Sequence, residues 1–342
     1  MNAPPFDYRR SGVESRPRLP AISAALVPSP TTVAVFLAQA DRLGGRTMVR
    51  CLRAGAWRGI TWEDARDRAF RIACGLVAAG VGPTERVAFL SEDRPESMSV
   101  QLGIQMAGAV PAVIASTAPA GVAQRSVGEC GAVLAITSGE LLAARLHLTG
   151  TLGRIVRLDG EVARWSEAEP EGTQYGEVLR RIRQLDPEGA AVIGYPAAGG
   201  AATTLTQRRL VSAAEGRVRA VGMSASDAAL AVLAPDHLMQ RILVGYMAIA
   251  AGATLCVALP ADVPARRVAA LQPTVLLAGP WLLEDLRHHA RAGHPSARWW
   301  LRRRVGGRRL RAVFAPDDPG PESQAFFRAV GLPVQVLGSG ER

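Results

Sequence analysis

Residues 86–115 read RVAFLSEDRPESMSVQLGIQMAGAVPAVIA, and this stretch decides the fold class. Two short apolar runs, Arg86–Ser91 and Val110–Ala115, flank a segment from Pro95 to Gly108 in which apolar residues recur at helical spacing. Short apolar strands that alternate with helices are typical of a parallel sheet buried on both faces. The stretch therefore predicts one strand–helix–strand unit of an α/β fold.

The same alternation extends in both directions along the chain. We expect doubly wound α/β sheets in two lobes, residues 31–185 and 186–342, after a flexible Pro-rich tail over residues 1–30 with six prolines. Residues 160–189 lose the apolar rhythm and predict a connection between the lobes with one short helix near Val178. The other predicted helices are 32–43, one that starts at Thr61 or Asp64 and ends near Gly80, 122–128, 207–223, 238–250, 265–271, 281–290 and 322–330. The other predicted strands are 47–52, 57–62, 132–137, 154–158, 190–195, 228–234, 253–259, 274–278, 310–314 and 334–337.

The charge of the chain is unusual in kind and in place. Among 342 residues there are 40 basic and 30 acidic side chains, and every basic residue is arginine. Without lysine the chain has no Walker phosphate loop, no Schiff-base lysine and no lysine general base. Nine arginines and no acid lie between Arg287 and Arg311, so the rest of the chain is nearly neutral. A charge confined to one segment disfavours nucleic acid as a partner.

The cysteines and histidines do not predict a metal site. The four cysteines lie far apart without a Cys-x-x-Cys pair, which argues against zinc and disulfides and favours a reducing, cytoplasmic location. His288, His289 and His294 lie close together but among arginines, so we expect no metal there. Residues 242–260 approach membrane-spanning length, but glycines interrupt them, and a helix, a turn and a strand explain them as well.

The loop GYPAAGGAATT, residues 194–204, follows a predicted strand and precedes a predicted helix. In α/β folds such a loop can hold a phosphate with its backbone N–H groups and the helix N-terminus. The glycines permit this, but the loop has no basic residue, and its hydroxyls come only at Thr203 and Thr204. On this chemistry alone, a plain turn is the stronger interpretation.

Several sequence blocks in a fixed order resemble a known family. They are GPTERVAFLSEDRPE (82–96), GAVP (108–111), PDHLMQR (235–241), GAT (252–254), QPT (272–274) and FFRAVGLP (326–333). From about Val33 to its end, the chain resembles the large N-terminal domain of the AMP-forming acyl-CoA synthetases of the long-chain fatty-acid type. The resemblance implies the fold of adenylate-forming enzymes. It also implies a reaction in which ATP and a fatty acid give an acyl-adenylate, from which coenzyme A takes the acyl group.

The resemblance implies ATP and Mg²⁺ as ligands, but the ATP loop departs from the family pattern. Family members hold the ATP phosphates with a YTSGTTGxPKG loop. Here the tyrosine is Tyr195, the next three residues are Pro-Ala-Ala, and the part with Gly199 and Gly200 is shortened and lacks the lysine. Because the hydroxyl donors and the cation are gone, we expect this loop to bind ATP poorly.

Two further ATP motifs of the family are altered here. The GGAP turn is similar in place to PDDP at residues 316–319, where Asp317 and Asp318 add negative charge near the expected phosphates. The YGxTE motif looks like LGSGE at the end of the chain, where Gly338 and Glu341 match. The resemblance leaves Glu341 able to take the family's magnesium-linked role, but the stacking tyrosine and the threonine hydroxyl are missing.

The family pattern also assigns a histidine and a second domain. His237 matches the histidine that borders the acyl and adenylate pocket, with a half-buried structural histidine as an equal alternative. Family members continue into a mobile C-terminal domain that bears the adenylation lysine, and we expect that domain to be absent. We therefore expect a pseudoenzyme that binds an acyl chain or a partner synthetase. A working ligase completed by a separate C-terminal domain, and a truncated gene product, are the alternatives.

The arginine-rich segment has its own two interpretations. In RWWLRRR, residues 298–304, Trp299 and Trp300 adjoin Arg302, Arg303 and Arg304. Aromatics beside cations bind anionic bilayer surfaces, at about 1 kcal/mol for each basic residue. Family members often carry a longer helical insertion near this place, and a solvated remnant of it is the favoured alternative. A peripheral membrane contact is the second interpretation, and nucleic acid ranks third.

Overall fold

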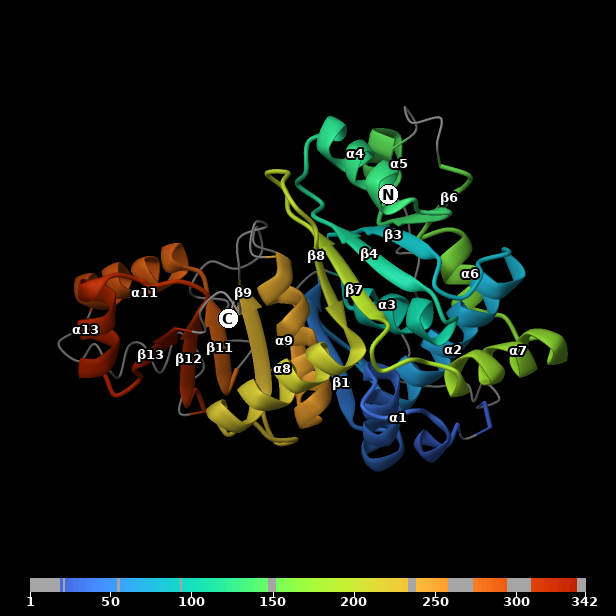
Figure 1. The fold of residues 1–342 in the computed structure, drawn as a ribbon. Coiled ribbons are helices and arrows are strands. Elements are labelled where there is room, and N and C mark those ends of the chain that lie inside the picture. Colours follow the sequence, from blue (N-terminus) through green and yellow to red (C-terminus); the bar gives the residue numbers. More distant parts are fainter. Residues whose placement is uncertain are drawn as a thin grey trace. The chain divides into compact units, whose positions relative to one another are not determined.

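The chain folds into two compact units. The computed structural model describes residues 19–20, 22–53, 56–92, 94–146, 152–232, 238–257, 273–293 and 309–336. One unit comprises residues 1–47 and 59–214, and the other comprises residues 48–58 and 215–342. Each unit is built on one largely parallel sheet with helices (Figure 1). The predicted α/β class with two doubly wound sheets is confirmed.

The first sheet, that of the first unit, has the strand order β6-β5-β3-β4-β7-β8. Its strands pair in parallel except for β8, which runs antiparallel to β7. The strands are β3 (Arg86–Leu90), β4 (Val110–Ile114), β5 (Leu134–Thr137), β6 (Ile155–Arg157), β7 (Ala190–Tyr195) and β8 (Thr203–Thr206). The helices are η1 (Ala24–Leu26), α1 (Thr32–Leu43), α2 (Trp62–Ala78), α3 (Ser97–Met106), α4 (Ala120–Cys130), α5 (Glu140–Leu146), α6 (Glu161–Glu167) and α7 (Gly172–Arg183).

Both faces of the first sheet are covered, as its apolar strands predict. Alternate residues of β3 and β4, among them Leu90 and Ile114, form one apolar cluster with residues of α4. Helices α2 and α3 lie on the opposite face (Figure 1). Helix α2 begins where predicted, because the Thr61 hydroxyl accepts a hydrogen bond of 3.1 Å from the Asp64 N–H. Helix α4 ends at Gly131, whose φ of 58° is a left-handed conformation that glycine adopts without strain.

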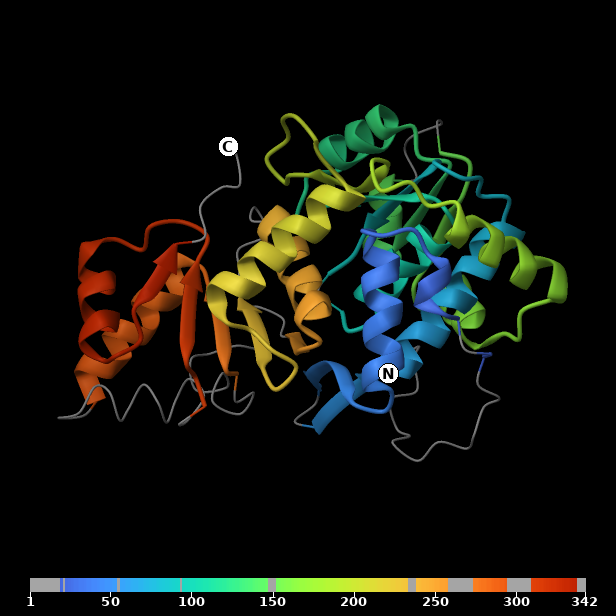
Figure 2. The same ribbon diagram turned by 60° about the horizontal axis from the view of Figure 1, so that its bottom comes forward.

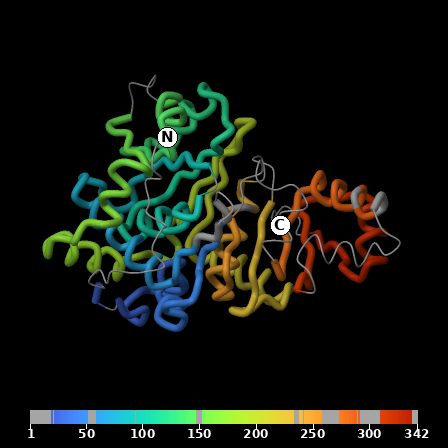
Figure 3. Tube along the Cα trace, turned by 180° about the vertical axis from the view of Figure 1, so that it is seen from behind, coloured from blue at the N-terminus to red at the C-terminus, as the bar shows by residue number. Residues whose placement is uncertain are grey.

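The helix predicted near Val178 is confirmed as α7, but the connection also contains a second helix, α6, that was not predicted. Both helices pack on α2 (Figure 3). Trp165 lies so close to Gly75 that a Cβ atom at Gly75 would be 2.3 Å from the Trp165 Cγ. The rings of Phe70 and Tyr175 lie 4.9 Å apart. Few apolar residues make these contacts among many acids, so the segment shows little apolar periodicity.

The second sheet has the strand order β13-β12-β11-β9-β10-β1-β2. From β13 to β1 each neighbouring pair is parallel. The strands are β1 (Thr47–Arg53), β2 (Ala56–Thr61), β9 (Ala228–Val232), β10 (Thr254–Val257), β11 (Val275–Ala278), β12 (Ala312–Ala315) and β13 (Val334–Val336). The helices are α8 (Gln207–Val221), α9 (Leu238–Ala251), α11 (Pro280–Gly293) and α13 (Pro321–Ala329).

Helices also cover the second sheet. Figure 2 shows α11 and α13 beside the strands of this sheet. Leu282 and Leu286 of α11 and Phe327 of α13 form a buried apolar cluster with one face of the sheet. Helix α9 contacts β9 and β10, and the turn between α9 and β10 explains the glycine-interrupted apolar run as predicted. Among the described helices, none has the length and apolar character that crossing a bilayer requires. The helix predicted over 265–271 lies outside the described residues.

The predicted boundary between the lobes at residue 185 is too early. Strand β7 pairs with β4 of the first sheet, and the division falls at Ala214, inside α8. The early strand β1, predicted within the first lobe, pairs in parallel with β10 instead, with Arg50 opposite Cys256. Strand patterns indicate which residues are extended but not their partners, and this partner lies far along the chain.

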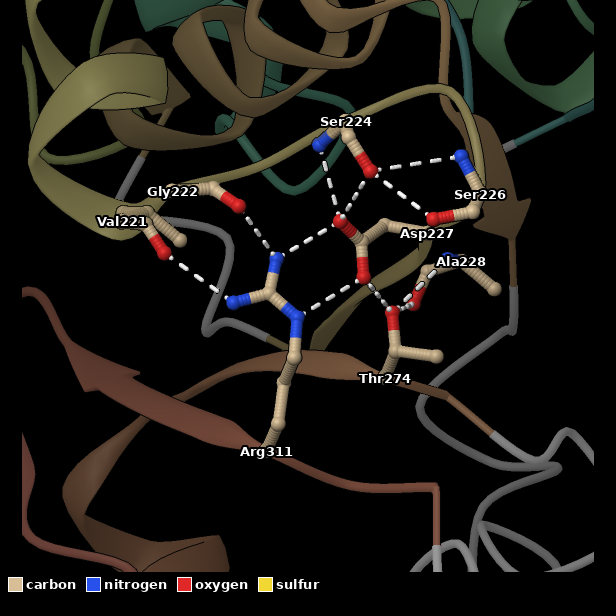
Figure 4. Close-up of polar contacts among 8 residues, drawn as sticks. All are labelled: Val221, Gly222, Ser224, Ser226, Asp227, Ala228, Thr274 and Arg311. Carbon is tan, nitrogen blue, oxygen red and sulfur yellow. Dashed lines mark hydrogen bonds and ion pairs between the residues drawn. The ribbon is translucent and has the colours of Figure 1, made fainter.

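A buried carboxylate fixes the amino edge of the second sheet (Figure 4). Asp227, Thr274 and Arg311 lie just before β9, β11 and β12. The Asp227 carboxylate accepts hydrogen bonds from Arg311 Nε (2.9 Å) and Nη2 (2.6 Å), from the Thr274 hydroxyl (2.6 Å) and from the Ser224 N–H (2.8 Å). Arg311 Nη2 also donates to the Gly222 carbonyl at 2.8 Å, beyond the end of α8. One side-chain cluster thus joins three strands and a helix end.

Candidate functional site

The predicted phosphate loop is a turn of the first unit between two antiparallel strands. Strand β7 ends at Tyr195 and β8 begins at Thr203, which lies opposite Gly194. The Gly199 N–H donates to the Pro196 carbonyl at 3.2 Å. Gly199 and Gly200 have φ angles of 79° and 111°, which glycine adopts most readily.

The expectation that this loop leads directly into a helix is wrong. Strand β8 separates the loop from α8, which begins only at Gln207. The threonines of this strand gave no sign of strand pairing in the sequence. The N-terminal N–H groups of α8 therefore do not belong to the loop, and the favourable helix-end electrostatics expected there are missing.

Tyr195 serves the core of the first unit. Its side chain is 5% exposed and belongs to the apolar cluster of β3, β4 and α4. Its carbonyl accepts a hydrogen bond of 3.2 Å from the Ala115 N–H. The pKa of Tyr195 is raised above its ordinary value, mainly because the side chain is buried. The tyrosine that the resemblance assigns to nucleotide binding is thus held as a neutral, buried group.

The loop offers almost no chemistry for a polyphosphate. Residues 196–202 consist of proline, alanine and glycine, so the loop has no side-chain donor and no cation. The first hydroxyls, at Thr203 and Thr204, are exposed on β8. Beside the loop lies Val122 of α4, whose methyl groups are 3.9 Å from where a Cβ of Gly199 would lie. Backbone N–H groups are therefore the loop's only donors, and no cation of the loop offsets the several negative charges of such a ligand.

The second altered motif lies in the second unit, after β12. Asp317 and Asp318 are both exposed there. The Asp318 carboxylate accepts hydrogen bonds from the Gly320 N–H (2.9 Å) and from Gln324 Nε2 (2.8 Å). This acid therefore holds the turn that leads into α13. Its negative charge stands at the carboxyl end of a parallel strand, where α/β folds bind their ligands.

The other predicted site residues cannot be placed. His237, Gly338, Glu341, Trp299, Trp300, Arg302, Arg303 and Arg304 lie outside the described residues. Of the histidine cluster, His288 is exposed, and its Nε2 lies 2.9 Å from Glu284. Within the described ranges no three His, Cys, Asp or Glu side chains gather to form a metal site. Magnesium at Glu341 therefore remains a prediction from the sequence.

Sequence reasoning missed one buried carboxyl, that of Glu96, which lies in the loop between β3 and α3. Its side chain is 3% exposed. Burial raises its pKa to about 7. The stretch around it, SEDRPES, is polar and resembles an ordinary surface loop, so no pattern marks this glutamate as buried.

One family model covers most of the chain. The model of the AMP-binding enzyme family matches residues 36–341. No protein of curated function matches the sequence significantly.

Solved structures show the same fold at low sequence identity. The N-terminal domain of FACL13 from Mycobacterium tuberculosis is 16% identical with a TM-score of 0.73, over 90% of this chain and 76% of that one. VinN in complex with L-aspartate is 17% identical with a TM-score of 0.72, over 91% and 75%. The AMPPNP-bound form of the nonribosomal peptide synthetase FmoA3 is 23% identical with a TM-score of 0.72, over 92% of this chain and 32% of that one. Through its matched residues and its fold, the chain belongs to the AMP-binding enzyme family.

Proposed function

We propose that this chain is a pseudoenzyme of the AMP-binding family, which binds an acyl chain or a partner synthetase and does not form acyl-adenylates alone. One observation carries the proposal: the loop from Pro196 to Ala202 has neither a side-chain donor nor a cation. A nucleotide triphosphate brings charge that such donors must neutralise. Hydrogen bonds to charged groups contribute about 1.5–3 kcal/mol each, so losing several of them removes most of the affinity.

Two further features favour the same function. Tyr195 is committed to the core of the first unit, so its ring does not serve a nucleotide. In the second unit Asp317 and Asp318 add negative charge at the end of β12, where the family pattern has uncharged residues. Each change alone weakens nucleotide binding, and they lie in different units and different motifs.

An apolar cavity in the second unit is the feature that suggests an acyl ligand. It has a volume of about 10 Å³ and is lined among others by Met223, Val244, Met247, Leu277 and Phe314. Its volume admits one methyl-sized group, so a longer chain requires side chains to move. Methionine side chains are flexible and adapt readily to apolar ligands. The cavity therefore supports an apolar ligand over a polar one.

Pyrophosphate exchange tests the proposal. The full chain is assayed for exchange of labelled pyrophosphate into ATP with a panel of fatty acids, and ATP binding is measured by calorimetry. We expect no acyl-dependent exchange and no saturable ATP binding. Acyl-dependent exchange would overturn the pseudoenzyme and support a working ligase instead. A fluorescent fatty acid then separates the binding roles: saturable binding supports an acyl ligand, and its absence leaves the partner synthetase.

A further inference from the structure

The side chain of Glu96 is enclosed at the start of α3 in the first unit. Glu96 is the residue before the helix, and its carbonyl accepts a hydrogen bond of 3.0 Å from the Val100 N–H. Its carboxyl does not cap the helix, and only 3% of the residue is exposed. This position at a helix start is where a carboxyl usually meets free N–H groups and water. Here the carboxyl is buried instead.

Three residues at the start of α3 each have a buried side-chain oxygen. Glu96 Oε2, Ser97 Oγ and Gln101 Oε1 are all enclosed and lack a hydrogen-bond partner within the described residues. Gln101 Nε2 folds back to the Ser97 carbonyl at 3.4 Å, so the end of this side chain lies over the first turn. An ionised carboxylate and an amide oxygen only accept hydrogen bonds, whereas the Ser97 hydroxyl can also donate one. Each unpaired buried group costs about 1–3 kcal/mol.

Among the described residues no arginine forms an ion pair with Glu96. The elements that pack against α3 are α1, α2, α7 and β4, and β4 carries no charge. The charged and titratable residues on the other three are Asp41, Arg42, Glu63, Asp64, Arg66, Asp67, Arg68, Arg71, Cys74, Tyr175, Glu177, Arg180, Arg181 and Arg183. Arg66 pairs with Asp67 at 2.8 Å, Arg71 pairs with Glu169 at 3.3 Å, and Arg181 pairs with Glu177 at 2.6 Å. In the described part of the chain, Glu96 forms no ion pair with any arginine of these helices or with Arg94 of its own loop. The acid Glu92 lies in the same loop.

We propose that Glu96 is protonated in the folded protein, and that loss of this proton loosens the first turn of α3. A protonated carboxyl is uncharged, so its burial needs no cation. An ionised one places a charge in the interior, where its own backbone N–H is a donor but no ion pair forms among the described residues, and this is far more costly. Because Glu96 lies at the very start of the helix, opening one turn is enough to let water reach it.

The loosening would act at the edge of the first sheet where ligands are expected. The chain leaving β3 goes to β4 on one side, and the chain leaving β5 goes to β6 on the other. Such a switch point is the usual ligand crevice of a doubly wound sheet. The two connections are already joined, because the Glu92 N–H donates to Ser138 Oγ at 3.2 Å and the Ser138 N–H donates to the Leu90 carbonyl at 3.1 Å. A proton on Glu96 thus controls one wall of this edge.

Urea unfolding of the full chain between pH 5 and pH 8.5 tests the inference. Three proteins are compared: the wild type, Glu96→Gln, and Glu92→Gln as a control at an exposed carboxyl of the same loop. The folded wild type binds one proton more than the unfolded chain, so its unfolding constant should rise about tenfold per pH unit up to about pH 7. Glu92→Gln should keep this rise and Glu96→Gln should lose it. Equal slopes in wild type and Glu96→Gln would overturn the inference.

Hydrogen exchange of the wild type gives a second readout that does not depend on whether Glu96→Gln folds. The Val100 amide reports the first turn of α3, and the Ala123 amide, bonded to the Pro119 carbonyl at 2.9 Å, reports the first turn of α4. After correction for intrinsic exchange, Val100 should lose at least about tenfold in protection from pH 6 to pH 8, while Ala123 keeps its protection. Unchanged protection at Val100 would overturn the inference. Neither readout involves ATP or an acyl chain, so failure here leaves the proposed function untouched.

Discussion

The Arg311 guanidinium and the Asp227 carboxylate form a two-point pair across the amino edge of the second sheet, with Nε–Oδ1 at 2.9 Å and Nη2–Oδ2 at 2.6 Å. The Asp227 side chain is 5% exposed, whereas that of Arg311 is 40% exposed. The carboxylate therefore depends on the arginine for its charge partner, and the arginine could reach water without it. Loss of the pair affects mainly the buried acid.

Replacement of Arg311 should destabilise the protein. We expect Arg311→Leu to lower the free energy of unfolding by about 2–3 kcal/mol, because it leaves the Asp227 charge buried with only Thr274 and Ser224 as donors. Urea unfolding measures the loss. The matched control is Arg219→Leu, which removes an exposed pair with Glu215 at 3.7 Å and should cost less than about 1 kcal/mol. Equal effects of the two changes would contradict this role of Arg311.

Acid should weaken the second unit through Asp227. Burial alone would raise the pKa of this carboxyl, but the hydrogen bonds from Arg311, Thr274 and the Ser224 N–H outweigh it and lower the pKa from 3.8 to about 2. The stabilisation is therefore complete above pH 4 and is lost as the pH falls to about 2. Between pH 4 and pH 2, we expect the free energy of unfolding of the wild type to fall by about 2 kcal/mol more than that of Asp227→Asn. Urea unfolding at pH 5, 4, 3 and 2 compares the two, and parallel pH curves would refute the prediction.

The contact between α2 and α6 should tolerate no side chain at Gly75. A Cβ atom there would lie 2.3 Å from the Trp165 Cγ and 2.5 Å from its Cδ2. Gly75→Ala should therefore destabilise the protein by about 1–3 kcal/mol, although alanine is the better helix former.

Gly176→Ala in α7 is the matched control for this change, because nothing lies within 4 Å of its added Cβ. It should stabilise the protein by about 0.5–1 kcal/mol. Thermal unfolding of both variants measures these opposite signs. A stabilising Gly75→Ala would show that α6 does not stay on α2 in solution.

The arginine-rich segment should retain the protein on anionic liposomes at low salt. Changing Arg302, Arg303 and Arg304 together to Ser removes about 3 kcal/mol of attraction, or roughly a hundredfold in partitioning, at about 1 kcal/mol per charge. Sedimentation with anionic vesicles at two salt concentrations measures it, and neutral vesicles are the control. If the bound fraction changes neither with salt nor with these substitutions, the segment does not bind the membrane and is a solvated remnant.

Local patterns predicted most of the strands and helices, but not their partners. The strands from β3 to β7 are short apolar runs, and burial on both faces makes such runs visible in the sequence. Helix α6 was missed, and α7 was predicted only as a short helix near Val178, because their buried contacts come from single residues such as Trp165 and Tyr175, spaced among acids. The pairing of β1 with β10 and of Asp227 with Arg311 joins residues far apart in sequence, which no local pattern encodes.

The candidate site was predictable in composition but not in geometry. The missing donors of residues 196–202 are evident in the sequence. Strand pairing places β8 between the loop and α8, and tertiary packing places Tyr195 in the core. Neither can be read from the composition. Glu96 gave no signal, because a carboxyl next to Pro95 in a polar stretch has the pattern of a surface loop.

The strand β1 has a consequence for how the chain is made. Arg50 of β1 lies opposite Cys256 of β10. The ribosome therefore completes β1 long before β10 has been synthesised. At about 5–20 residues per second, the interval is on the order of 10–40 s. During that time the flanking segments of the first unit can fold, while β1 presents unpaired N–H and C=O groups to other nascent chains. A fragment that starts at Glu215 would lack the edge that β1 and β2 provide, so the second unit can be produced alone only with residues 48–58 joined to it.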